Sequence, residues 1–161
     1  MIYAIFNHTK QMRLLIVFSQ NARRIPCVGN FFAAMLEYVV RIYFSSEISS
    51  KAVIPSDVVF VHGSDIVIGA GVFVGRRCKI FNGVTLGNRD TETTVVNQPV
   101  IGDDCVISTG AKILGNINIG NRSIVGANAV VICDVPPDSI AVGVPAKVLP
   151  RNKSERLTRL H

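Results

Sequence analysis

An aliphatic residue returns at every sixth position through the second half of the chain. A mostly small or β-branched residue stands four places after each of these anchors. No amphipathic helix has a period of six, so the pattern predicts a solenoid of parallel β-coils in which three hexads make one turn. The anchors are Ile101, Ile107, Ile113, Ile119, Val125 and Val131, and the residues four places on are Cys105, Ala111, Ile117, Ser123, Ala129 and Val135.

The same period runs upstream of position 87, with a two-residue insertion between Phe60 and Ile68. A longer interruption at 87–100 predicts a loop that protrudes from the coil. One hexad cannot bury its own anchor, so coils must stack, and each fully buried Ile, Val or Leu then contributes about 1.5–3 kcal/mol. The upstream anchors are Ile48, Ile54, Phe60, Ile68, Val74, Ile80 and Leu86.

Residues 1–46 do not follow this period, and we expect them to form an N-terminal helical segment. The stretch 31–44, FFAAMLEYVVRIYF, is apolar, contains Glu37 and Arg41, and is too short to span a bilayer comfortably. It predicts a helix packed on the coil or on a neighbouring subunit, with peripheral contact to a membrane surface as the alternative. The first residues lack a signal-peptide core and a cleavage site, so we expect no secretion. A β-helix domain at 47–150 and a basic C-terminal tail at 151–161 would complete the chain.

Composition supports one folded domain, since 48% of the 161 residues are hydrophobic and 17% are charged. The four cysteines form no CxxC pair and no metal-ligand spacing with the three histidines, so we expect no zinc site, no other metal and no disulfide framework. Cys78 and Cys105 fall at the small position of their hexads, where a free thiol fills apolar space, and this favours a reducing, cytoplasmic setting.

The net charge of +6 is partly concentrated near the C-terminus. Such a basic region could serve nucleic acid, membrane phosphates or a phosphorylated cofactor. Nucleic acid is the least favoured partner, because aromatic residues are few and no reader module is present. The basic residues are Lys147, Arg151, Lys153, Arg156 and Arg159.

His62 is the first candidate for chemistry, because it stands directly before the two-residue insertion in FVHGSDIVIG. A break in the regular coil puts a side chain at a rim, and a neutral imidazole can accept the proton that leaves a hydroxyl near neutral pH. A solvated turn histidine is the alternative interpretation.

Four stretches of the chain resemble the catalytic half of the serine acetyltransferases, which are hexapeptide-repeat enzymes. They are EISSKAVIPSDVVFVHGSDIVIGAGVFVG, VTLG at 84–87, GAKILGNINIG, and the closing VPPDSIAVGVPAKV. The resemblance implies a left-handed parallel β-helix and an O-acetyltransferase that uses acetyl-CoA as its donor. It also implies a homotrimer whose active sites lie between subunits.

The resemblance also implies roles for individual residues. His62 would deprotonate the acceptor hydroxyl, and the Glu47 carboxylate would hold the other ring nitrogen, where the family has an aspartate. Backbone groups of Gly87 and Asn88 would stabilise the oxyanion, with the Asn82 amide as a further donor. Coenzyme A would lie in a groove between subunits; its matching residues are Thr109, Gly110, Gly126, Ala127 and, near the phosphates, Lys147.

The acceptor side departs from the family. Val61 replaces an acidic residue before the histidine, and Asn97 and Gln98 replace an Arg-His pair. The contacts that hold the ammonium and the carboxylate of serine are therefore weakened. Arg89, Asp90 and Glu92 of the long loop are the candidates that would substitute. We therefore expect acetyl transfer to a sugar hydroxyl of a surface polysaccharide or its precursor. Serine O-acetylation is the close alternative, and a non-catalytic β-helix scaffold is the alternative of another class.

The N-terminal segment is much shorter than the helical region that pairs trimers in the family. A trimer should survive this truncation, and the sequence leaves open whether trimers pair into hexamers. The apolar helix would suit work at the inner face of a membrane.

Overall fold

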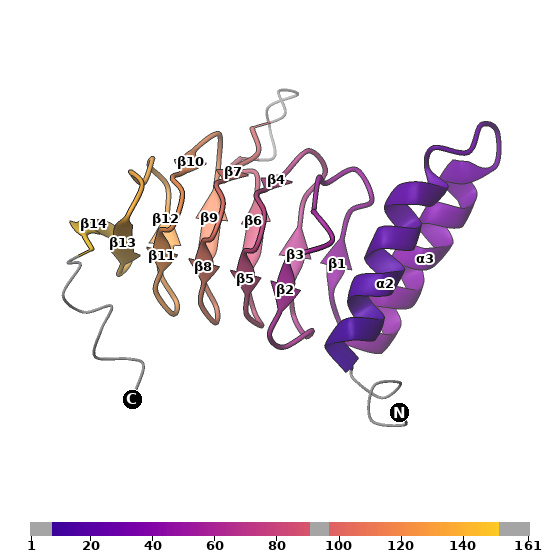
Figure 1. The fold of residues 1–161 in the computed structure, drawn as a ribbon, viewed down its shortest axis with the longest axis horizontal. Helices are drawn as coiled ribbons and strands as arrows, with labels where there is room; N and C mark the ends of the chain where they lie inside the picture. The colour runs from indigo at the N-terminus through magenta and orange to yellow at the C-terminus, as the bar shows by residue number, and fades with distance from the viewer. Residues whose placement is uncertain (1–7, 91–96, 152–161) are drawn as a thin grey trace.

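The chain folds into a helical hairpin followed by a three-sided prism of short parallel strands (Figure 1). The computed structural model describes residues 8–90 and 97–151. The prism is a left-handed parallel β-helix, as the sequence pattern and the family resemblance together predict. The hairpin stands at one end of the prism and the last strands stand at the other.

The hairpin consists of α2 (His8–Ala22) and α3 (Gly29–Phe44). The helix expected over 31–44 is present and begins two residues earlier. Helix α2 lies within the helical segment expected over 1–46, but the sequence did not give its bounds, because polar residues interrupt its apolar ones on every turn. At Gly29 a side chain would meet the Ala22 carbonyl oxygen at 2.2 Å, so the two helices approach where only glycine fits. Ser45, in the left-handed conformation, ends α3.

Three parallel sheets form the faces of the prism, and we name them sheets A, B and C. Sheet A contains β1 (Glu47–Ile48), β3 (Val67–Ile68), β6 (Thr85–Gly87), β9 (Lys112–Leu114) and β12 (Val130–Val131). Sheet B contains β4 (Phe73–Val74), β7 (Val100–Ile101) and β10 (Asn118–Ile119). Sheet C contains β2 (Val59–Phe60), β5 (Lys79–Ile80), β8 (Val106–Ile107), β11 (Ile124–Val125), β13 (Ser139–Val142) and β14 (Lys147–Pro150).

The strand register accounts for the period of the sequence. Val67 pairs with Thr85, so one regular coil takes 18 residues, which is three hexads. Thr85 pairs with Lys112, 27 residues later, because the loop between β6 and β7 is inserted in that coil. The insertion leaves the pairing on both sides parallel and in register, so the prism continues past it undisturbed.

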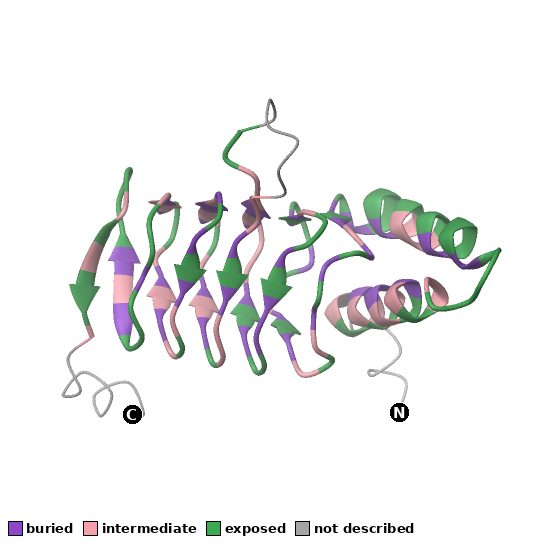
Figure 2. Ribbon diagram, turned by 90° about the horizontal axis from the view of Figure 1, so that it is seen from above, coloured by how far each residue is buried: buried purple, intermediate pink, exposed green. Residues whose placement is uncertain are grey.

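The aliphatic anchors form the interior of the prism, as predicted. All thirteen are buried, and each short strand places one residue inward and its neighbour outward (Figure 2). The residues at the small position are buried as well, including Cys78 and Cys105, which are free thiols. Continuous burial of these two columns makes the stacked coils one core.

The far end of the prism is closed by an antiparallel pair that the six-residue period did not predict. Strand β13 pairs in parallel with β11 on one side and antiparallel with β14 on the other. Because β14 runs back along β13, it covers the strand edge that further coils would otherwise extend.

Candidate active site

The turns that lead from sheet C to sheet A stack into one long edge, which we name the C–A edge. It consists of residues 61–66, 81–84, 108–111 and 126–129. Backbone hydrogen bonds join successive turns: Gly83 N donates to Ser64 O at 3.1 Å, Gly110 N to Asn82 O at 2.9 Å, and Asn128 N to Thr109 O at 2.9 Å. The candidates on this edge are therefore neighbours in space, although they span 66 positions of sequence: His62, Asn82, Thr109, Gly110, Gly126 and Ala127.

His62 lies on the widened turn at the start of this edge. Its side chain is exposed, and its ring meets Phe81 of the next coil edge to face, with centroids 6.3 Å apart. Buried Ser46 holds this turn in place. Its hydroxyl donates a hydrogen bond to the Gly63 carbonyl oxygen at 3.3 Å and accepts one from Ile66 N at 3.0 Å. The two-residue insertion thus presents an imidazole to solvent on a rigid support.

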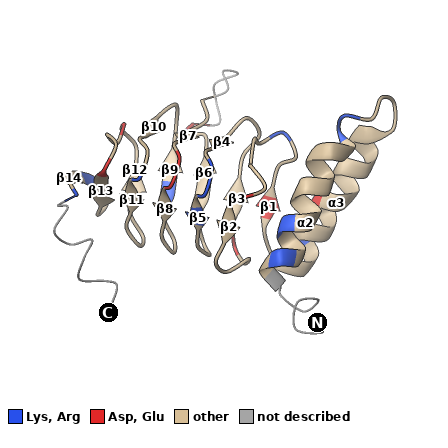
Figure 3. Ribbon diagram, viewed as in Figure 1, with Lys and Arg blue, Asp and Glu red and all other residues tan. Residues whose placement is uncertain are grey.

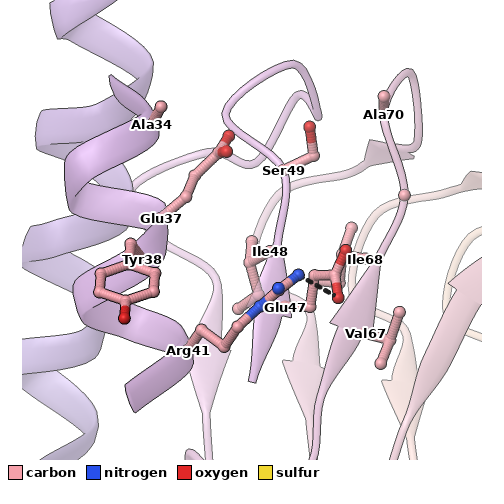
Figure 4. Close-up of a pocket in the computed structure, with 11 residues that line it drawn as sticks. Ala34, Glu37, Tyr38, Arg41, Glu47, Ile48, Ser49, Val67, Ile68 and Ala70 are labelled. Atoms are coloured by element: carbon pink, nitrogen blue, oxygen red, sulfur yellow. Dashed lines mark ion pairs between the residues drawn. The ribbon is translucent and has the colours of Figure 1, made fainter. Parts of the chain in front are cut away.

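Glu47 starts β1, on the strand that runs directly beside the His62 turn. Its backbone N–H donates to Ile66 O at 2.8 Å, but its carboxylate pairs with Arg41 of α3, with Nη2 and Oε2 2.6 Å apart (Figure 4). Among the described residues the Glu47 carboxylate has no bond to His62. A carboxylate and an imidazole are thus brought to adjacent segments, and the predicted dyad is not formed in the isolated chain.

A pocket of about 380 Å³ opens beside Glu47, between α3 and the outer face of sheet A (Figure 4). Glu37 and Arg41 enter it from the helix, and Glu47 and Ser49 enter from the first coil. Glu37 also accepts a hydrogen bond from Ser50 N, which ties the helix to the coil. The sequence did not predict this pocket, since Arg41 and Glu37 read only as interruptions of an apolar stretch.

The acceptor-side candidates lie at the opposite edge of sheet A, where β6 leads into the long loop. Gln98 Nε2 donates to Asn88 Oδ1 at 2.9 Å and so closes the base of this loop. A side chain at Gly69 would approach Gln98 Oε1 to 2.8 Å, and this buried oxygen has no partner among the described residues. A single chain therefore does not bring Asn88 or Gln98 together with His62.

The remaining loop candidates add little within one chain. Asn97 is partly buried, Arg89 and Asp90 are exposed, and Glu92 lies outside the described residues. Gly87 has open space around the position of a Cβ, so its smallness is not required by packing.

Two candidate positions for coenzyme A also have a packing role in the turns of the coil. A Cβ at Gly110 would meet Asn128 Oδ1 at 2.0 Å, and one at Gly126 would meet Val142 Cγ1 at 2.7 Å. The backbone N–H of Gly126 donates to Ala141 O, as that of Gly110 does to Asn82 O. The small size of Gly110 and Gly126 therefore also serves the packing of the turns against the next coil. Ala127 is exposed, and Lys147 is exposed on β14 at the far end.

Lys112, at the start of β9, contacts the C–A edge and was not singled out by the sequence. It faces outward on β9, and its Nζ donates to Gly83 O at 2.6 Å, beside Asn82. Asn82 itself accepts a hydrogen bond from the Thr109 hydroxyl at 3.2 Å. The strand register could have found Lys112, because it places Glu47, Val67, Thr85 and Lys112 in one outward column of sheet A.

The edge between sheets B and C carries ion pairs rather than candidate chemistry. Arg77 binds Asp104 through two hydrogen bonds of 2.7 Å, and this guanidinium lowers the pKa of Asp104. Arg76 likewise lowers the pKa of Asp57 through a side-chain hydrogen bond of 3.0 Å.

Over 8–90 and 97–151, no group of three or more His, Cys, Asp or Glu residues is placed to hold a metal ion. The same residues contain no helix long and apolar enough to cross a membrane.

Comparison with known proteins agrees with this architecture. Residues 98–133 match the family profile of the bacterial transferase hexapeptide, six repeats. The chain is 39% identical over 122 residues to the serine acetyltransferase of Bacillus subtilis. The aligned region covers 76% of this chain and 56% of the relative. It is 38% identical over 122 residues to that of Buchnera aphidicola subsp. Schizaphis graminum, covering 76% of the chain and 47% of the relative.

Solved structures give the same result. A serine acetyltransferase in complex with CoA superposes with a TM-score of 0.75 at 30% identity, over 84% of this chain and 54% of that one. Soybean serine acetyltransferase complexed with serine superposes with a TM-score of 0.73 at 34% identity, over 86% of this chain and 54% of that one. The chain thus spans about half the length of the proteins it matches.

Proposed function

The chain is a serine acetyltransferase-like hexapeptide-repeat protein with a left-handed parallel β-helix, and from this premise we propose that it is an acetyl-CoA-dependent O-acetyltransferase. The observation that carries the proposal is the exposed imidazole of His62, held on a rigid turn beside the strand that begins with Glu47. A scaffold has no need of this widened turn or of an exposed histidine on it.

In the proposed reaction, His62 accepts the proton of the acceptor hydroxyl while the oxygen attacks the thioester carbonyl of acetyl-CoA. The tetrahedral intermediate expels the CoA thiolate, which takes the proton back from the imidazolium, so the proton balance closes. Glu47 steadies the imidazolium after its carboxylate turns away from Arg41. This turn costs little, because exposed ion pairs contribute about 0–1 kcal/mol.

The donor fits the C–A edge, which runs from His62 past Asn82 and Thr109 toward the far end of the prism. Acetyl-CoA would place its thioester near His62 and its pantetheine arm along this edge. Thr109, Gly110, Gly126 and Ala127 remain the proposed contacts along the arm, and Lys147 the proposed contact for a phosphate. Gly87 and Asn88 remain the proposed oxyanion donors.

A homotrimer is part of the proposal. His62 stands at one edge of sheet A, whereas Asn88 and Gln98 stand at the other, so both sets meet at one site only where two chains lie side by side. A ring of three chains closes such a contact with identical interfaces.

Serine is the acceptor that the comparisons favour over a sugar hydroxyl, since the named relatives are serine acetyltransferases and one is complexed with serine. A sugar hydroxyl remains the second candidate because of three uncharged residues. Val61, Asn97 and Gln98 offer no ion pair to the carboxylate or ammonium of an amino acid. Arg89, Asp90 and Glu92 are the charged loop residues that would compensate if serine is bound.

The test is release of free thiol from acetyl-CoA by the purified full-length chain, offered serine and then a panel of sugars and oligosaccharides. We expect turnover with one acceptor class and none with His62→Ala. Turnover with serine alone would exclude the sugar proposal, and the reverse result would exclude serine. Thiol release with neither class would leave the protein as a non-catalytic β-helix.

A further inference from the structure

The outer face of α3 is apolar along its whole length and uncovered in the described structure. We name as the α3 outer face the six residues Phe31, Phe32, Met35, Tyr38, Ile42 and Tyr43, whose exposed fractions run from 45% to 72%. The opposite side of the helix is already used, since Gly29, Ala33, Val40 and Phe44 are buried. The helix is therefore apolar on two opposite sides, and packing within the described chain covers only one of them.

The spacing of the exposed residues makes the face continuous. Phe31, Met35, Tyr38 and Ile42 follow one another at intervals of four, three and four, so they line up along one side of a helix. No charged residue falls between them on this side. The connection between the helices extends the apolar surface, because Ile25 and Val28 are also about half exposed there.

Basic residues outnumber acidic ones in the helical hairpin. Residues 8–46 hold five basic side chains and one acidic one, Glu37, which is turned toward Ser50 of the coil. Arg23 and Arg24 stand in the connection between the helices, beside Ile25, and they form no ion pair among the described residues (Figure 3). The helical hairpin therefore carries much of the net positive charge of the chain, together with most of the exposed aromatic residues found in 8–90 and 97–151.

We propose that the α3 outer face docks on a lipid bilayer that contains anionic lipids. Aromatic and aliphatic side chains entering the headgroup region, with arginines at the phosphate level, are the pattern of a helix that lies in the plane of a membrane surface. The excess of basic residues in the hairpin complements the negative charge of such a bilayer. The helix lies on the membrane and does not cross it, in accord with the absence of a spanning helix among the described residues.

Vesicle co-sedimentation of the full chain tests the proposal. We expect sedimentation with vesicles of phosphatidylcholine and phosphatidylglycerol, and little with phosphatidylcholine alone. The double variant Phe31→Ser, Ile42→Ser should bind at least about tenfold less. Arg23→Ser with Arg24→Ser should lose about fivefold per arginine, the equivalent of about 1 kcal/mol each. The matched sheet B control is Val53→Ser with Phe73→Ser, which removes an exposed apolar residue of β4 and its exposed bridge partner, and it should bind like the unaltered chain.

Two exposed cysteines allow a second readout that leaves the α3 outer face and the arginines unchanged. Cys27 lies in the hairpin connection and Cys133 lies near the far end of the prism, and both are exposed. An environment-sensitive fluorophore on Cys27, in a Cys133→Ser background, should shift to the blue on anionic vesicles. The same label on Cys133, in a Cys27→Ser background, should not shift.

Equal sedimentation of the α3 variant and the sheet B control would overturn the proposal, as would an unchanged Cys27 spectrum. The proposal would also be overturned if the unaltered chain did not sediment with vesicles and the double variant Phe31→Ser, Ile42→Ser eluted as smaller species on size-exclusion chromatography. The face would then be an interface between copies of this chain. Circular dichroism spectra matching that of the unaltered chain would show that each variant folds.

Discussion

Arg41 Nη2 lies 2.6 Å from Glu47 Oε2, so the last turn of α3 is tied to the first strand of the prism through the carboxylate proposed to assist His62. Both side chains are more than half exposed. The pair is therefore weak in free energy, but it decides where the Glu47 carboxylate points in the isolated chain.

Arg41→Ala should change the free energy of unfolding by less than about 1 kcal/mol, because solvent screens an exposed pair. Urea denaturation of the variant and the unaltered chain measures this difference. Glu47→Gln is the companion variant: it should be equally mild for stability, yet it should lower kcat, because the neutral amide no longer stabilises an imidazolium. Unchanged kcat in Glu47→Gln would remove Glu47 from the proposed mechanism.

His62→Ala should lower kcat by roughly 10² to 10⁴, the usual contribution of general-base catalysis, without altering the assembly. Its side chain is exposed and its described contact is the ring of Phe81, so the prism does not depend on it. Thiol release measures kcat, and light scattering after size exclusion measures the assembly. Near-normal turnover in the variant would mean that another group removes the proton.

Ile107→Ala should destabilise the prism by about 2–5 kcal/mol, since the side chain is fully buried and its loss leaves a cavity. Ile107→Val removes one methyl group and should cost about 0.5–1.5 kcal/mol. Urea denaturation of both variants gives the comparison. Equal effects of the two substitutions would contradict a tightly packed interior column.

Gly75→Ala should destabilise the fold, whereas Gly87→Ala should not. A Cβ at Gly75 would meet backbone carbon and oxygen of Gly102 at 2.5 and 2.6 Å, and the backbone there cannot move away. No atom lies within 4 Å of a Cβ at Gly87. Thermal denaturation of both variants checks this contrast, and any loss of activity in a fully stable Gly87→Ala would report on the proposed oxyanion site alone.

Asp104→Asn should lower the thermal midpoint at pH 7 at low salt, with the difference fading as pH falls. Arg77 lowers the pKa of Asp104 in the folded chain. The pair therefore stabilises the fold above the ordinary pKa of an aspartate, about 3.9, and this stabilisation is lost as pH falls through the lower folded value. Asp65→Asn is the control, because Asp65 is exposed, has the same left-handed backbone conformation and forms no ion pair among the described residues. A constant difference between pH 7 and pH 3 would contradict the role of this pair.

The prism was predictable because each inward anchor is a local requirement that repeats. Ile107 or Val125 can be assigned to the interior from spacing alone, since nothing but a coil of three faces gives a period of six. The closing pair β13 and β14 broke that period and was therefore missed. Helix α2 lay within the helical segment expected over 1–46, but its bounds were not predicted, because the face that buries Met12 and Ile16 is defined only by the packing of α3 and the coil against it.

The candidate site was predictable only in part. His62 was found because the insertion disturbs the period, and the structure places it on an exposed turn. The Arg41–Glu47 pair and the Lys112–Gly83 contact join segments that lie in different coils or different elements, and no sequence interval encodes them. Gly110 shows the converse, because its smallness matched a family position and yet serves the packing of Asn128.

The nine extra residues between β6 and β7 have a consequence for how proteins of this shape change over time. Thr85 and Lys112 stay paired across them, so a corner of the prism tolerates lengthening without any repacking of the interior. Changes in the length and sequence of this loop can then alter acceptor preference while the β-helix itself stays the same. Evolvability in this solenoid therefore resides at the corner where the long loop leaves the prism.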